Sequence, residues 1–178
     1  MARVLLLYGT SEGQTATIAE RIGEVLSAAG HEPALVHAKH RPPGFALSDY
    51  DAVIVAASVH VGKHQKYVTR FVREHADELA SMPSAFVSVS LSAAGDEESQ
   101  AEAAALIDEF VERTGWKPDH TLSAAGALRF SEYGLLTKFV MKQIAHSQSG
   151  DTDTARDYEY TDWESVESFA GEFVSELA

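Results

Sequence analysis

Short apolar runs of strand length alternate along this chain with segments whose apolar residues recur at helical spacing, such as Ile18, Ile22 and Leu26. The runs are Val4–Leu7, Ala34–Val36, Ala52–Ala57, Ser84–Ser90 and Leu122–Ala125. Strands that alternate with helices form a parallel sheet with helices on both faces and right-handed crossovers. We therefore predict a doubly wound α/β fold whose five-stranded parallel sheet has the order 2-1-3-4-5.

Sequence signals also mark where several helices lie. Gly30 stands where a C-cap glycine ends the helix after the first strand. Thr161-Asp162-Trp163-Glu164 has the pattern of a capping box before the last helix. Trp116 and Trp163 sit at the ends of amphipathic helices, so we expect both in the core. A helix after the third strand presents one apolar face, made of Val68, Phe71, Val72, His75 and Leu79.

Composition and charge exclude several classes of protein. The 178 residues are enough for one α/β domain, which we expect to span 1–178. The absence of cysteine excludes a disulfide framework, a cysteine-bound cluster and a thiol nucleophile. A formal net charge of −13 argues against non-specific nucleic-acid binding, which needs a basic footprint. We see no secretory signal and no run long enough to span a bilayer, so a cytoplasmic protein is expected.

The residues that follow the first strand, Tyr8–Thr15, have the composition of a phosphate-binding turn. Hydroxyl groups and the free N–H groups at the start of the next helix can point at one anion, which the helix dipole also favours. The turn lacks the lysine of a nucleoside-triphosphate loop and the spacing of a GxGxxG dinucleotide turn. A monophosphate held by neutral donors remains, as in flavin mononucleotide (FMN); the alternative is a turn without a ligand. The predicted phosphate loop consists of Thr10, Ser11, Glu12, Gly13, Gln14 and Thr15.

Two further loops leave the carboxyl ends of neighbouring strands, so we expect them to meet the phosphate loop at one crevice. They are predicted to hold the isoalloxazine ring of the flavin, with no side chain acting as a catalytic acid or base. The second loop contributes Ser58, Val59, His60, Val61 and Gly62, and the third contributes Ser90, Leu91, Ser92 and Ala93. His60 and His64 have the spacing of helix-borne metal ligands but lie at a strand exit without a nearby third ligand, so no metal site is predicted.

The segment Gly126–Tyr160 is too long for an ordinary connection between a strand and a helix. We interpret residues 127–156 as a functional insertion near strand five. Apolar residues such as Leu136 and Phe139 keep helical spacing there and predict a short amphipathic helix. Asp157–Tyr160 is expected to complete the fifth strand, which the insertion would split.

Several segments occur in an order that resembles one enzyme family. They are the phosphate loop, Met82–Phe86, Trp116–Asp119, Ala125–Phe130, Ser149–Thr154 and Tyr160–Trp163. Together they resemble the flavodoxin-like, menaquinone-dependent protoporphyrinogen IX dehydrogenases over almost the whole chain. Ordinary flavodoxins do not share the segments after Trp116. The resemblance implies a flavodoxin-like fold, FMN as cofactor, and oxidation of protoporphyrinogen IX to protoporphyrin IX in haem biosynthesis. It also implies that menaquinone or another quinone accepts the electrons.

The chain departs from that family where substrate is expected to bind. Glu12 stands where flavodoxins usually have a third hydroxyl residue, so one phosphate donor is lost and a carboxylate is added. Acidic residues also replace basic and aromatic ones in the insertion and in the third loop. A tetrapyrrole with two carboxylates needs cations, and the candidate substrate-binding residues are Arg129, Tyr133, Lys138 and Lys142.

A quinone confined to the bilayer implies a peripheral membrane contact. In the predicted contact, the basic residues Lys138 and Lys142 reach the lipid headgroups, and apolar area comes from Leu135, Leu136, Phe139, Val140 and Ile144. The alternative is that this apolar face packs on the sheet. Whether the protein forms a homo-oligomer stays open. Two other functions also stay open: a flavodoxin-type electron carrier without a substrate of its own, and a non-catalytic flavodoxin-like module.

Overall fold

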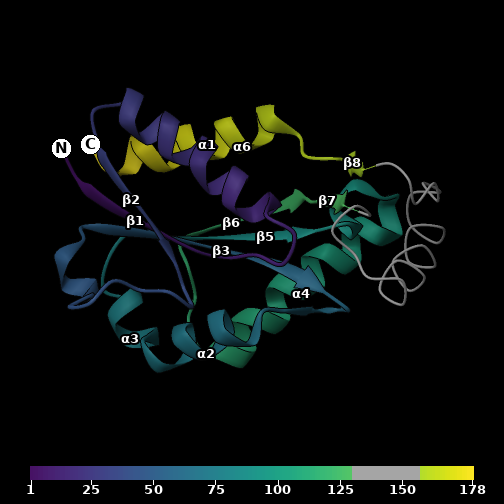
Figure 1. Cartoon of the computed structure of the whole chain (residues 1–178), viewed down its shortest axis with the longest axis horizontal. Coiled ribbons are helices and arrows are strands. Elements are labelled where there is room, and N and C mark those ends of the chain that lie inside the picture. The colour runs from purple at the N-terminus through teal and green to yellow at the C-terminus, as the bar shows by residue number, and fades with distance from the viewer. Residues whose placement is uncertain (130–156) are drawn as a thin grey trace.

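The computed structural model describes residues 1–129 and 157–178, and it shows a central parallel sheet between two layers of helices (Figure 1). The strands of the sheet are β1 (Arg3–Gly9), β2 (Glu32–His37), β3 (Ala52–His60), β5 (Ser84–Ser90) and β6 (His120–Ala125). Their spatial order is β2-β1-β3-β5-β6, and each neighbouring pair is parallel. This is the predicted 2-1-3-4-5 arrangement, so the fold class is confirmed.

Helices cover both faces of the sheet (Figure 1). One layer contains α1 (Gln14–Ala28) and α6 (Trp163–Glu176), and the other contains α2 (Lys66–Glu74), α3 (Ala76–Leu79) and α4 (Glu97–Thr114). Because side chains alternate along a strand, each central strand feeds both layers, which explains its continuous apolar sequence. The core under α1 and α6 includes Leu6, Ile54, Val87, Ile18 and Phe169. The core under α2 and α4 includes Leu5, Val53, Phe86, Phe71 and Phe110.

Two predictions about local structure are confirmed directly. The Gly30 N–H donates to the Ser27 carbonyl (3.0 Å) and the His31 N–H to the Leu26 carbonyl (3.0 Å), which are the two bonds of a Schellman motif at the end of α1. Trp116 is fully buried in the core under α2 and α4. Trp163 is only partly buried and packs against the edge of the other core.

The helix predicted to run past His75 is divided in two. The Phe71 carbonyl accepts a hydrogen bond from the His75 N–H (3.1 Å) and is also 2.9 Å from His75 Nδ1. The backbone of His75 departs from helical geometry (φ −120°, ψ 20°), so α2 ends at Glu74 and α3 starts again at Ala76. Leu79 still reaches the same core as Phe71, so the apolar face was predicted correctly although the helix was not.

The predicted capping box at the last helix is wrong by one residue. Asp162 is the N-cap of α6, because its carboxylate accepts the Ser165 N–H (3.3 Å) and hydroxyl (2.7 Å). These hydrogen bonds, the one from the hydroxyl foremost, hold the pKa of Asp162 below its usual range. Thr161 is occupied elsewhere: its hydroxyl donates to the Ala125 carbonyl (2.8 Å) and accepts from Gln14 Nε2 (2.8 Å).

The prediction that Asp157–Tyr160 completes the fifth strand is also wrong. β8 (Asp157–Glu159) pairs antiparallel with β7 (Ala127–Arg129) in a separate two-stranded sheet. β7 leads away from β6 and β8 leads back toward α6, so the two strands run in opposite directions and pair antiparallel. The strands of the main sheet are parallel. Within the described ranges, no helix is long and apolar enough to cross a membrane.

A short strand β4 (Lys63–His64) folds back on the end of β3 and buries His64. The His64 ring lies edge-on to Phe86 and Phe110, and its Nε2 is 2.8 Å from Ser88 Oγ. Burial lowers the pKa of His64 to about 4, and the charge of Arg113 acts in the same direction. The folded protein therefore keeps this imidazole neutral where the unfolded chain would protonate it.

We expect the free energy of unfolding to fall as pH falls from about 6.5 toward 4, because only the unfolded chain then binds a proton at His64. His64→Gln keeps a hydrogen-bonding group near Ser88 but cannot titrate. It should lose about 3 kcal/mol less than wild type between neutral pH and pH 4. Urea unfolding at a series of pH values measures this difference, and parallel pH profiles for the two proteins would contradict it.

Candidate functional site

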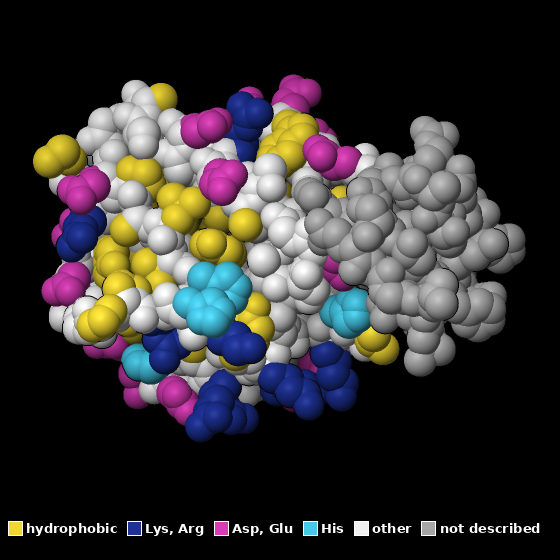
Figure 2. Space-filling model, in the orientation of Figure 1, with side chains coloured by type: hydrophobic (Ala, Val, Ile, Leu, Met, Phe, Trp, Pro, Cys, Tyr) yellow, Lys and Arg dark blue, Asp and Glu magenta, His cyan; other side chains and the backbone are white. Residues whose placement is uncertain are grey.

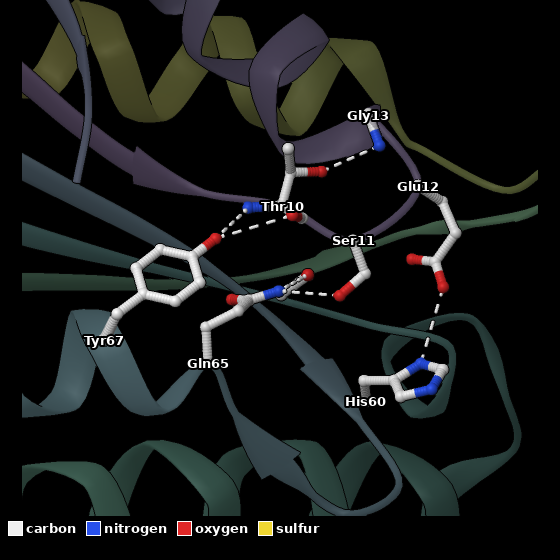
Figure 3. A network of polar contacts seen from close by, with 8 residues as sticks. Thr10, Ser11, Glu12, Gly13, His60, Gln65 and Tyr67 are labelled. Carbon is white, nitrogen blue, oxygen red and sulfur yellow. Dashed lines mark hydrogen bonds and ion pairs between the residues drawn. The ribbon is translucent and has the colours of Figure 1, made fainter. Parts of the chain in front are cut away.

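The predicted phosphate loop connects β1 to α1 at the carboxyl end of the sheet. Gly13 has a φ of 91°, a conformation that favours glycine, and it is the N-cap of α1. Its N–H donates to Thr10 Oγ1 (2.8 Å), which fixes the curve of the loop (Figure 3). The loop therefore wraps around the start of a helix, where free N–H groups favour an anion.

Two residues at the start of α2 hold this loop in place (Figure 3). Gln65 Nε2 donates to Ser11 Oγ (3.2 Å) and also to Ser58 Oγ, so it joins the phosphate loop to the end of β3. The Tyr67 hydroxyl accepts the Thr10 N–H (3.2 Å) and lies 3.5 Å from the Thr10 carbonyl. Sequence analysis missed both residues, since their only signal was a position directly after the second loop.

The carboxylate of Glu12 is engaged by the second loop. Its Oε1 lies 3.4 Å from His60 Nδ1, and the side chain extends toward His60 and away from Thr10 and Gly13 (Figure 3). The acid is therefore directed at the end of β3, although Glu12 still lines the small cavity where the loops meet. His60 and His64, considered above as metal ligands, have different partners, Glu12 and Ser88.

Three buried polar atoms around the crevice have no hydrogen-bond partner among residues 1–129 and 157–178: Thr15 Oγ1, Ser90 Oγ and Gln65 Oε1. They come from the phosphate loop, the third loop and the start of α2. Buried polar groups are normally paired, and leaving one unpaired costs about 1–3 kcal/mol. A bound ligand with its own donors and acceptors would satisfy them, so the residues present fit a phosphorylated cofactor.

The second loop is a tight β-hairpin between β3 and β4. Its two turn residues, Val61 and Gly62, have φ values of 51° and 73°, the pattern of a type I′ turn. This conformation is rare for a β-branched residue, and the Val61 side chain is 66% exposed. The sequence did not predict the hairpin, because valine is not among the residues that usually form such turns.

A cavity of about 490 Å³ lies between this hairpin, the third loop and α4. Val59, Val61, Leu91 and Leu106 give it apolar walls, and Ser90 and Ser92 add hydroxyl groups. Glu102 and Glu109 of α4 stand at its side. The cavity is suited to a flat, largely apolar ring with polar atoms on its edge.

A smaller cavity of about 30 Å³ brings the three predicted loops together. The predicted residues that line it are Thr10, Glu12, Gln14, Thr15, Ser58, Val59, His60, Ser90 and Leu91. Ala93 does not line either of these cavities and instead faces one beside β6 and α6. Of the candidate substrate-binding residues, Tyr133, Lys138 and Lys142 lie outside the described residues, as do the predicted amphipathic helix and its membrane contact. Arg129 is the last residue of β7, and its side chain is not described.

The chain matches the flavodoxin domain family over residues 5–155. It is 35% identical over 170 residues to protoporphyrinogen IX dehydrogenase (quinone) of Escherichia coli strain K12, which covers 96% of this chain and 93% of the relative. The enzyme of the same name from Leishmania major is 30% identical over 173 residues, covering 97% of this chain and 75% of the relative.

Solved structures support the same fold. Oxidised flavodoxin 1 from Bacillus cereus superposes with a TM-score of 0.58 at 16% identity, covering 99% of both chains. A flavodoxin from Streptococcus pneumoniae TIGR4 gives a TM-score of 0.55 at 17% identity, covering 98% of this chain and 99% of the other. With the sequence matches, these findings establish that the chain belongs to the flavodoxin domain family and, within it, to the protoporphyrinogen IX dehydrogenases of the quinone type.

Proposed function

We propose that this protein oxidises protoporphyrinogen IX to protoporphyrin IX and passes the electrons through FMN to a quinone. The observation that carries the proposal is the 35% identity, over 96% of the chain, to the protoporphyrinogen IX dehydrogenase (quinone) of Escherichia coli. The likeness to flavodoxins concerns the fold and does not by itself separate an enzyme from an electron carrier. We further propose menaquinone as the quinone, the membrane surface as the place of reaction and haem biosynthesis as its role.

The flavodoxin domain identifies FMN as the cofactor. We place its phosphate at the phosphate loop, held by Ser11, Thr15 and the N–H groups that open α1. The fit rests on the unpaired Thr15 Oγ1 and on the Glu12 carboxylate being drawn aside by His60. We place the ring between the second and third loops, where the unpaired Ser90 Oγ is available to its polar edge.

When bound, the flavin supplies an acceptor for a hydride, which it then gives up to a quinone. The chain's own groups bind and orient the reactants. Val61 and Leu91 cover apolar surface and exclude water, and Ser90 offers a hydroxyl to whatever charge develops on the ring. We assign no catalytic acid or base among the side chains.

We also propose that residues 127–156 are an insertion in a single domain and that they give the enzyme its substrate chemistry. The support is the antiparallel pair of β7 and β8, in which Arg129 lies opposite Asp157. This pairing brings the two ends of the segment together after the end of β6. The segment can therefore be added to the fold without disturbing the main sheet.

One experiment tests the proposed function most directly. Purified protein with a flavin spectrum is mixed anaerobically with protoporphyrinogen IX, and the visible flavin absorbance should be lost as porphyrin absorbance appears. A water-soluble menaquinone analogue should then restore the flavin absorbance. A flavin that protoporphyrinogen cannot reduce but that a reductase partner can would make the protein an electron carrier and overturn the proposal.

Replacing Thr15 by valine should weaken FMN binding by about tenfold to 150-fold, because one hydrogen bond to a charged phosphate is lost. Thr15 is fully buried with an unpaired hydroxyl, and valine has nearly the same shape. The FMN-free variant should therefore be as stable as the FMN-free wild type or more stable by about 1 kcal/mol. Fluorescence titration of FMN and urea unfolding of the FMN-free proteins measure the two effects.

The matched control is Thr121→Val, on the exposed side of β6, which should leave FMN affinity unchanged. Equal FMN affinity in Thr15→Val and in the control would remove Thr15 from the phosphate site. A Thr15→Val protein that loses FMN because it has unfolded would be recognised by its urea curve.

Replacing residues 130–156 by Asn-Gly should give a folded, yellow protein without dehydrogenase activity. The two residues would join Arg129 to Asp157, which already face each other, and Asn-Gly favours the type I′ turn of a two-residue hairpin. Flavin content and anaerobic reduction by protoporphyrinogen are the measurements. Full activity in this variant would show that the substrate is handled by the described part of the chain alone.

A further inference from the structure

Basic residues are concentrated in one groove of a strongly acidic protein. The chain has 14 Lys and Arg against 27 Asp and Glu. Figure 2 shows Lys and Arg side chains gathered along the lower edge of the molecule, the side on which Figure 1 places α2. A groove of about 390 Å³ is lined there by Lys63, His64, Lys66, Thr69, Arg70, Arg73 and Arg113.

Three elements contribute cations to this groove. Lys63 comes from β4 and Arg113 from α4, and Lys66, Arg70 and Arg73 follow the same face of α2, since they are four and three residues apart. The fold therefore brings charges from distant parts of the sequence to one place. A set of basic residues on one helix alone would be an ordinary solvated face.

Carboxylates neutralise only part of this charge. Arg70 pairs with Glu74 (3.0 Å) and Arg113 with Glu109 (2.7 Å), and both pairs are largely exposed, so they are weak. Within the described ranges, Lys63, Lys66 and Arg73 make no ion pair. The groove thus keeps a local positive charge that is open to an anion.

The groove lies next to the apolar cavity at the second and third loops. A small space of about 20 Å³ lies between them, and it shares Gly62, Leu106 and Glu109 with the lining of the apolar cavity. At its other end it shares Lys63 and Arg113 with the basic groove. A ligand whose apolar ring lies against the flavin ring that we place in this cavity could therefore extend anionic arms to the neighbouring groove.

Charge also decides the direction in which such a ligand would lie. Glu102 stands beside the apolar cavity and would repel carboxylates placed there, whereas Glu109 is paired with Arg113 (2.7 Å). The cations lie in the neighbouring groove, and carboxylates that reach them would form charge-assisted hydrogen bonds. The ring would lie toward the apolar cavity, and the carboxylate arms would lie toward the basic groove.

We infer that this basic groove binds the carboxylate groups of an amphiphilic ring substrate whose ring lies toward the flavin loops. The inference rests on the proposed function, under which the carboxylates are the two propionates of protoporphyrinogen IX. It moves their binding site from Arg129, Lys138 and Lys142, as expected from the sequence, to β4, α2 and α4. A concave groove beside an apolar cavity suits a small dicarboxylate better than a flat lipid surface.

The test compares three FMN-loaded proteins: wild type, Lys66→Ala/Arg73→Ala, and a control, Lys39→Ala/Lys117→Ala. Both variants lose the same charge, and all four positions are exposed and outside the flavin loops. The probe is protoporphyrin IX, followed by the change in its absorbance on binding. The Lys66→Ala/Arg73→Ala protein should bind it about five- to thirtyfold more weakly than the control does, and the difference should shrink as salt is added.

Protoporphyrin IX dimethyl ester serves as the second probe, because it keeps the ring and lacks both negative charges. All three proteins should bind the ester equally. If the groove variant binds the free acid as tightly as the control, the inference is overturned. If it binds the free acid normally but loses binding to phosphatidylglycerol vesicles, the groove serves lipid headgroups, and the inference is overturned as well.

Failure of the proposed function would look different. A wild-type protein that binds protoporphyrin IX with the expected charge dependence, but whose flavin protoporphyrinogen does not reduce, would support the carboxylate groove and overturn the proposed reaction. A protein that is reduced by protoporphyrinogen but shows no effect of Lys66→Ala/Arg73→Ala would keep the reaction and overturn the groove.

Discussion

The start of α2 holds the phosphate loop and the second loop in one arrangement, and the rest of the site depends on it. Gln65 bonds to Ser11 and to Ser58, and Tyr67 bonds to the main chain at Thr10. Parallel strands deliver the loops to the same edge of the sheet, but loops at that edge could still adopt many conformations. These contacts select one, in which Glu12 faces His60 and the buried hydroxyl of Thr15 stays unpaired. Gln65 and Tyr67 therefore preorganise the site before a cofactor binds.

The predictable part of this fold is the part governed by local pattern. The fourth strand was predicted as Ser84–Ser90 and is β5 with those bounds, because a run buried on both faces is apolar or small throughout. The predicted cap of the last helix was wrong because a side chain bonds to a distant partner in place of its local one. Asp162 rather than Thr161 caps α6, because Thr161 is needed by Ala125 and Gln14, which are distant in sequence. The roles of Gln65 and Tyr67 could not be predicted either, because their partners in the phosphate loop lie more than fifty residues away.

The acidity of the chain and its proposed dianionic substrate are compatible only if charge is arranged locally. A net charge of −13 repels an anion, but salt largely screens this repulsion at distances beyond about 10 Å. Close to the surface, the sign of the nearest side chains decides. The groove between β4, α2 and α4 collects cations, and Glu102 stands apart from them beside the neighbouring apolar cavity. Such a gradient orients a ligand as well as attracting it, which a uniformly basic surface would not do.

The ends of the proposed insertion are tied directly to the phosphate loop. The Tyr160 N–H donates to the Gly126 carbonyl (3.1 Å), and the Thr161 hydroxyl donates to the Ala125 carbonyl, so the returning chain is fixed to the end of β6. The same hydroxyl accepts a bond from Gln14, the first residue of α1. A shift of β8 relative to β6 would therefore strain the contact that holds the helix end where we place the phosphate. Under the proposed function, this hydrogen-bonded junction would join the loop that contacts the cofactor to the two ends of the inserted segment.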